Sequence, residues 1–146
     1  MRLFLDASVL LAAAGSSTGA SRAIFSYASE QNWSLVSSPY ALNEVLRNLA
    51  KLPGNATTDW LRLRLQLVVV DDVVSLDKPV VFAASKDRPI LFTALAWSTV
   101  LLTLDKADFD DVLGGRFYGL DVLLPYDLLE RERAAGRLID RAGSNS

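Results

Sequence analysis

Short apolar runs alternate along this chain with longer segments in which apolar residues recur at helical spacing. The first run, Met1 to Leu5, ends at Asp6, as expected of a strand buried on both faces of a parallel sheet. A helix is expected directly after Asp6, and a second, amphipathic helix from about Ala20 to Gln31. The first part of the chain is therefore predicted to fold as a strand followed by two helices.

The same alternation continues to the end of the chain. The strands predicted there are 33–38, 67–74, 99–104 and 119–125, and the helices are 39–52, 57–66, 79–85, 88–98 and 126–136. Ser38 and Pro39 predict one helix start, with the serine hydroxyl as its cap. Together these elements predict an α/β fold, a three-layer α/β/α sandwich around a central, mostly parallel sheet.

The length of the chain fits one domain. Residues 1–140 are expected to form a single globular domain, and the polar residues 141–146 a flexible tail. The long uncharged stretch 89–104 falls short of the ~20 residues that a membrane helix needs, and an ionised Asp6 would interrupt the apolar region of a secretory signal. We therefore expect a soluble, cytoplasmic protein that does not span a membrane.

The residue composition restricts the chemistry that the protein can perform. The chain contains no cysteine and no histidine, which excludes thiolate nucleophiles, thiolate metal sites and the commonest general base near neutral pH. Catalysis would have to use carboxylates, hydroxyls, lysine or arginine. The formal net charge of −2 gives no basic field, so composition argues neither for nor strongly against an RNA partner.

Acidic residues stand at the ends of predicted strands and the starts of predicted helices. Asp6 and Asp105 each end a strand, and ligands of parallel sheets bind outside the carboxyl ends of the strands, so the two are candidates for one cluster. Capping is the simpler explanation. Asp6 and Asp87 are well placed as helix N-caps, a role worth about 1 kcal/mol, and Asp105 could cap a turn.

Glu44 also has two interpretations. Its helix has an apolar stripe made of Leu42, Val45, Leu46, Leu49 and Ala50. Glu44 projects from the opposite side, one turn before Arg47, so a solvated face with a weak surface ion pair is the simpler interpretation. A neighbouring loop or helix could still cover it.

Four short motifs carry a resemblance to a known family. They are LDAS after the first strand, PYALNEVLRNL on a helix, KDRPILFTAL at the start of a later helix and LLTLDKADF after a strand. Their order and spacing, from about residue 2 to residue 127, resemble the PIN-domain ribonucleases, particularly the toxin subunits of bacterial VapC-type toxin–antitoxin pairs. Each motif is short and degenerate, and the ordered set is much more specific than any member.

The resemblance implies a function, partners and a site. The function is that of a metal-dependent endoribonuclease that hydrolyses RNA phosphodiester bonds, with an antitoxin protein as partner and a homodimer as the assembly. The catalytic acids that it implies are Asp6, Glu44, Asp87 and Asp105, with Asp108 as a further candidate, and the hydroxyls that orient ligands or bound water are Ser8 and Thr103.

Several carboxylates that converge repel each other, and a divalent cation resolves this conflict. Oxygen ligands without histidine or cysteine favour Mg²⁺ or Mn²⁺ and disfavour zinc. We expect Asp6 and Asp87 as the principal metal ligands and Asp105 as a direct or water-mediated ligand. Glu44 is expected to position or deprotonate the attacking water.

Other residues are candidates for contacts with partners. Arg88 and Lys106 stand beside acids and could contact RNA phosphates, although long cationic side chains usually remain in water. Trp60, Leu61 and Arg64 on one helix are candidates for an antitoxin groove, although core packing is the simpler role of Trp60.

Two other functions remain open. One is a different metal-dependent nuclease or phosphatase on a similar fold, but haloacid-dehalogenase-like phosphatases show D-x-D after the first strand, and the stretch here is Asp6-Ala7-Ser8. The other is a non-catalytic PIN-like binding module that keeps its acids only as caps. A metal titration separates them, because a protein of the second kind should bind Mn²⁺ no better than its Asp6→Asn variant.

Overall fold

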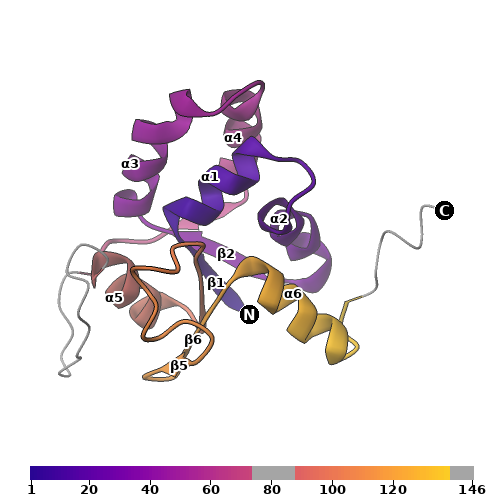
Figure 1. The fold of residues 1–146 in the computed structure, drawn as a ribbon, viewed down its shortest axis with the longest axis vertical. Coiled ribbons are helices and arrows are strands. Elements are labelled where there is room, and N and C mark those ends of the chain that lie inside the picture. The colour runs from indigo at the N-terminus through magenta and orange to yellow at the C-terminus, as the bar shows by residue number, and fades with distance from the viewer. Residues whose placement is uncertain (74–87, 139–146) are drawn as a thin grey trace.

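A computed structural model describes residues 1–73 and 88–138 of the chain (Figure 1). The strands are β1 (Arg2–Leu5), β2 (Ser34–Ser37), β3 (Leu67–Val69), β4 (Val100–Leu102), β5 (Arg116–Phe117) and β6 (Leu120–Leu123). The helices are α1 (Ala7–Gly15), α2 (Ala20–Gln31), α3 (Pro39–Asn48), the 3₁₀ helix η1 (Leu49–Lys51), α4 (Ala56–Arg64), α5 (Arg88–Trp97) and α6 (Pro125–Ala134). The helix predicted at 79–85 lies outside the described residues, and each other predicted element has a counterpart.

The strands form one sheet in the order β3-β2-β1-β4-β6-β5. The pairs among the first five strands in this order are parallel, and among the described strands only β5 pairs antiparallel, with its neighbour β6. Strand β1 from Leu3 onward and all of β4 are buried, as expected of central strands that helices cover on both faces. The predicted α/β fold around a mostly parallel sheet is confirmed. Strand β5 was not predicted, because two residues are too few to show a period of two.

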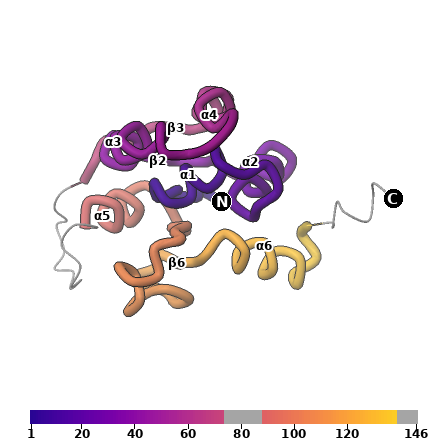
Figure 2. The backbone as a smooth tube through the Cα atoms, turned by 45° about the horizontal axis from the view of Figure 1, so that its top comes forward, coloured from indigo at the N-terminus to yellow at the C-terminus, as the bar shows by residue number. Residues whose placement is uncertain are grey.

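The helices pack around the sheet and around each other. Helix α1 packs against α2, α3 and α4, and α2 also packs against α6 (Figure 2). Trp60 on α4 is buried in the core cluster, so its predicted core role is confirmed. No helix in the described part of the chain is both long enough and apolar enough to cross a membrane.

Helix α3 differs from its prediction at its start and along one face. Ser38 holds the N-cap position, but its hydroxyl makes no capping hydrogen bond. The backbone N–H of Tyr40 instead donates to both carboxylate oxygens of Asp72, at 3.2 and 3.1 Å. A carboxylate at this end of a helix also interacts favourably with the helix dipole. The stripe prediction was wrong for Leu46 and Ala50, which are exposed, because this side of α3 faces solvent.

The connections between strands reverse direction at the centre of the sheet. From β1 the chain moves to β2 on one side, whereas from β4 it moves to β5 and then β6 on the other side. Such a reversal opens a crevice outside the carboxyl ends of the two central strands, where α/β proteins bind their ligands. Asp6 directly follows β1 and Thr103 directly follows β4, so both residues lie at this point of the sheet.

Candidate active site

The Asp6 carboxylate is buried at the carboxyl end of β1 and accepts three hydrogen bonds. Its Oδ1 accepts from the backbone N–H of Ala7 at 2.8 Å, so Asp6 caps α1. Its Oδ2 accepts from the hydroxyls of Ser8 at 3.0 Å and Thr103 at 2.8 Å. Ser8 Oγ in turn accepts from the backbone N–H of Leu104 at 3.0 Å. The cap is thus also the centre of a hydroxyl network that joins β1 to the segment after β4.

Burial raises the pKa of the Asp6 carboxyl above its usual value of 3.8. Removal from water disfavours the charged form, and this effect exceeds that of the hydrogen bonds from Thr103, Ser8 and Ala7, which favour it. The charge of Glu44 adds a smaller repulsion in the same direction as burial. Asp6 is therefore a carboxyl whose ionised form would be stabilised by a nearby cation, and perturbed carboxyls of this kind occur often at functional sites.

Glu44 lies on α3, half-buried, within electrostatic reach of Asp6. The predicted surface ion pair with Arg47 is absent: within the described part of the chain, these two side chains form no ion pair. Two carboxylates, one directly after β1 and one on α3, therefore act on each other near the carboxyl end of the sheet.

The loop after β4 connects Asp105 to Asp6 through Thr103. The backbone N–H of Asp105 donates to Thr103 Oγ1 at 3.0 Å, and this hydroxyl donates to Asp6 Oδ2. Asp105 Oδ1 accepts from the backbone N–H of Asp108 at 3.1 Å. Asp105 therefore caps a turn, as the simpler interpretation predicted, and Thr103 fixes its position relative to Asp6.

The remaining predicted site residues are placed only in part. Asp87 lies outside the described residues. The side chains of Arg88, at the start of α5, and Lys106 are exposed. Within residues 1–73 and 88–138, no three acidic side chains are arranged to hold a metal ion. The groups that do meet are the buried Asp6 carboxylate and two hydroxyls, and oxygen ligands of this kind favour Mg²⁺ or Mn²⁺ over zinc.

Apolar residues line a surface groove of about 510 Å³ between α3, α4 and the end of β3. The lining residues are Pro39, Leu42, Asn43, Leu46, Leu49, Thr57, Trp60, Leu61, Arg64 and Val69. The Leu46 and Leu61 side chains in this groove are each 62% exposed. Leu42 and Glu44 are two positions apart, about 200° around the helix. Helix α3 thus lines the groove with one side and carries Glu44 on another.

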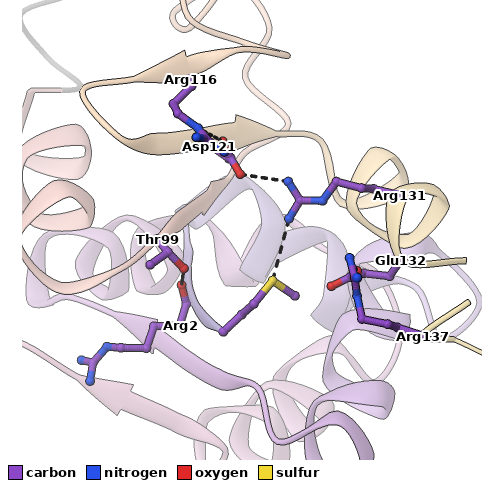
Figure 3. A network of polar contacts seen from close by, with 8 residues as sticks. Arg2, Thr99, Arg116, Asp121, Arg131, Glu132 and Arg137 are labelled. Carbon is purple, nitrogen blue, oxygen red and sulfur yellow. Dashed lines mark hydrogen bonds and ion pairs between the residues drawn. The ribbon is translucent and has the colours of Figure 1, made fainter. Parts of the chain in front are cut away.

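A second carboxylate, Asp121, lies at the opposite edge of the sheet, near the start of β6 (Figure 3). Its Oδ1 accepts from Nε of Arg116 and its Oδ2 from Nη1 of Arg131, both at 2.9 Å. The hydrogen bond from Arg116 is the main cause that lowers the pKa of Asp121, and Arg131 lowers it further. The chain's own arginines therefore balance the charge of this carboxylate.

Sequence reasoning missed one polar group at the carboxyl edge. Ser38, predicted only as a helix cap, is fully buried at the end of β2 and does not cap α3. The sequence shows that Ser38 stands between a strand and a helix. A serine at that position is expected both for a helix cap and for a residue at the carboxyl edge, so the sequence does not distinguish the two roles. Asp72, the residue that does cap α3, is distant in sequence and carried no signal.

The fold has a counterpart among solved structures. One chain of the crystal structure of VapBC2 from Rickettsia felis, bound to a DNA fragment from its promoter, matches this chain with a TM-score of 0.58. The match covers 84% of this chain and 97% of that chain, at 14% sequence identity. At this identity the likeness shows a PIN-like α/β fold and no more. No protein-family profile matches the sequence, and no curated protein is significantly similar to it.

Proposed function

We propose that this protein is a metal-dependent endoribonuclease, the toxin component of a toxin–antitoxin pair. One observation carries the proposal: the buried Asp6 carboxylate, with its raised pKa, is joined to the segment after β4 by Thr103 at the point where the sheet connections reverse. The charge of Glu44 acts on the same carboxylate. The PIN-like fold, shared with a chain of a VapBC2 complex, supports the same class of protein.

In this proposal Asp6 and Asp87 would be the principal metal ligands, and Asp105 would complete a direct or water-mediated set. A bound Mg²⁺ or Mn²⁺ ion would supply positive charge that favours deprotonation of a water and stabilises the leaving oxygen. Ser8 and Thr103 hold one oxygen of the Asp6 carboxylate in a fixed direction. Asp108 supports Asp105 by donating its backbone N–H to that carboxylate.

In this proposal Glu44 accepts the proton of the attacking water, because its charge acts on Asp6 from a separate helix. The water oxygen forms a bond to phosphorus, the bond from phosphorus to the leaving ribose oxygen breaks, and that oxygen takes up a proton from solvent. In this proposal the exposed side chains of Arg88 and Lys106 contact flanking phosphates. No nucleophile from the protein is required.

The test is cleavage of defined RNAs in the presence of Mg²⁺, Mn²⁺ or EDTA. We expect cleavage with either cation and none with EDTA. Asp6→Asn should cleave at least about 100-fold more slowly, because loss of the ligand removes several kcal/mol of stabilisation. Asp121→Asn, at the other edge of the sheet, is the matched control and should cleave at the wild-type rate. Full activity of Asp6→Asn would exclude the metal assignment.

A non-catalytic binding module is the second candidate function. It is favoured by the observation that Asp6 and Asp105 both cap local structure. In that case wild type and Asp6→Asn would bind Mn²⁺ equally weakly, and neither would cleave RNA with any cation. Mn²⁺ binding that requires Asp6 would exclude this candidate.

The toxin assignment also requires a partner, and the α3–α4 groove has a suitable surface. We propose that an apolar helical segment of an antitoxin binds in this groove, because exposed leucines line it. The segment would carry an acidic residue to pair with Arg64, which also lines the groove. Coexpression with the product of the adjacent reading frame should give a complex, and Leu61→Lys should prevent it. Homodimers of the free protein that Leu61→Lys dissociates would instead make the groove a dimer interface. The proposed location of the protein is the cytoplasm.

A further inference from the structure

Ser38 carries a buried hydroxyl that has no hydrogen-bond partner among the described residues. The residue is 0% exposed. Leaving a buried polar group unpaired is unfavourable, and such groups in native proteins often mark a functional role or an associated water or ion. The neighbouring Ser37 is equally buried, but its hydroxyl donates to the backbone carbonyl of Leu5 at 3.1 Å. Two adjacent serines of equal burial therefore differ in whether the hydroxyl has a partner.

The usual role of a serine at this position is performed by another residue. A serine at the N-cap accepts a hydrogen bond from a backbone N–H in the first turn of its helix. In α3 the carboxylate of Asp72 takes the N–H of Tyr40, and the Ser38 hydroxyl makes no capping bond. The hydroxyl is therefore available for a partner other than its own helix.

The strand register places Ser38 beside Asp6. When the parallel ladders of β1 with β2 and with β4 are continued beyond their last pairs, Asp6 stands between Ser38 and Thr103. Asp6 and Ser38 both keep an extended backbone, so the alternation of the strands continues to them and their side chains leave the same face of the sheet. The hydrogen bond from Thr103 to Asp6 confirms this continuation on one side.

We propose that Ser38 is a positioning residue of the Asp6 site, whose hydroxyl hydrogen-bonds to a water molecule that a Mg²⁺ or Mn²⁺ ion holds beside Asp6. The inference rests on the proposed function. A rotation about χ1 redirects the hydroxyl between staggered positions, and the group both donates and accepts. Direct contact with an RNA phosphate is disfavoured, because the Ser38 side chain is shielded from solvent.

The test combines Mn²⁺ binding by isothermal titration calorimetry with urea unfolding in the absence of Mn²⁺. Ser38→Ala should bind Mn²⁺ about tenfold more weakly, as is typical when a residue that supports metal ligands is removed. It should unfold at the wild-type urea concentration, because its hydroxyl has no bond to lose. Ser38→Thr keeps the hydroxyl and should restore the affinity. The matched control Ser37→Ala should unfold at a lower urea concentration and bind Mn²⁺ as the wild type does.

The outcomes distinguish this inference from the proposed function. If Asp6→Asn loses Mn²⁺ binding and Ser38→Ala keeps it, the role of Ser38 is overturned and the proposed function stands. If Ser38→Ala unfolds as early as Ser37→Ala without Mn²⁺, its hydroxyl is structural and the inference is again overturned. If the wild type itself does not bind Mn²⁺, both the inference and the metal-dependent function are overturned.

Discussion

The two edges of the sheet each carry an aspartate, and the two aspartates have opposite electrostatic environments. At the carboxyl edge, Asp6 accepts hydrogen bonds from one backbone N–H and two hydroxyls, and burial raises its pKa. At the amino edge, Asp121 lies between the guanidinium groups of Arg116 and Arg131, which lower its pKa (Figure 3).

The difference indicates which carboxylate is suited to bind a cation. The charge of Asp121 is already balanced by side chains of the chain itself, so an added ion would have to displace an arginine. The donors to Asp6 fix its direction but carry no charge, and Glu44 adds a second negative charge. Charge balance, more than the number of acids, therefore makes the carboxyl edge the better candidate for a cation site.

The largest effect that would sharpen this comparison is expected from Glu44→Gln. If Glu44 accepts the proton of the attacking water, the glutamine side chain cannot replace it as a base. The rate of RNA cleavage should then fall about 100-fold, the lower end of the range for general-base catalysis. The control is Glu130→Gln, an exposed acid on α6 that pairs with Arg133, which should cleave at the wild-type rate. Equal rates for the two variants would remove Glu44 from the mechanism.

The second effect concerns stability and compares two threonines at the ends of β4: Thr99 precedes the strand and Thr103 follows it. Thr103→Val should lower the free energy of unfolding by about 2 kcal/mol, because it removes a buried hydrogen bond to a carboxylate. Thr99→Val should cost less than about 0.5 kcal/mol, because the exposed Thr99 hydroxyl makes only a 3.4 Å contact with the carbonyl of Arg2. Urea denaturation measures both, and equal losses would contradict the contrast between the edges.

The third effect is that Asp121→Asn and Asp6→Asn should change the stability of the folded protein in opposite directions. Without divalent cations at neutral pH, Asp121→Asn should lower the free energy of unfolding by about 1 kcal/mol, since it weakens two partly exposed ion pairs. Asp6→Asn should raise the melting temperature, because an uncharged amide replaces a buried carboxylate and the facing hydroxyls can accept as well as donate. Destabilisation by both substitutions would show that Asp6 is a structural cap.

The smallest effect is expected in the pH dependence of stability. The folded-state pKa of Asp6 is raised, so its contribution to stability is fully present below 3.8 and is lost as pH rises through the raised value. The folded-state pKa of Asp121 is lowered, so its contribution is present above 3.8 and is lost as pH falls through the lowered value. Melting temperatures of wild type and Asp6→Asn should therefore diverge as pH rises above 3.8. A constant difference in melting temperature between the two proteins across this pH range would contradict the raised pKa of Asp6.

Much of the fold could be predicted from the sequence because the buried strands are short apolar runs. Strands β1 and β4 are such runs, and each is followed by a polar residue where the chain leaves the sheet. The exposed side of α3 could not be predicted, because Leu46 has the same helical spacing whether it packs in the core or lines a groove. The cap of α3 could not be predicted either, because Asp72, which accepts from the backbone N–H of Tyr40, lies after β3 and is distant in sequence.

For the candidate site, the sequence could predict which residues follow the strands and in which order, but not which of them are in contact. The positions of Asp6 and Thr103 after two strands were visible in the sequence, but their hydrogen bond depends on β1 and β4 being neighbours. The two strands are neighbours because the chain crosses from β3 to the other side of β1 before it forms β4, and no local pattern specifies this crossover. Ser38 is a similar case, since its place beside Asp6 depends on the register of β2 with β1.

Mn²⁺ binding by wild type, Asp6→Asn and Asp121→Asn, measured side by side by isothermal titration calorimetry, tests the contrast between the two edges most directly. We predict that wild type and Asp121→Asn bind with the same affinity and that Asp6→Asn binds at least about tenfold more weakly. Equal binding by Asp6→Asn and wild type, or loss of binding in Asp121→Asn alone, would contradict a cation site at the carboxyl edge of the sheet.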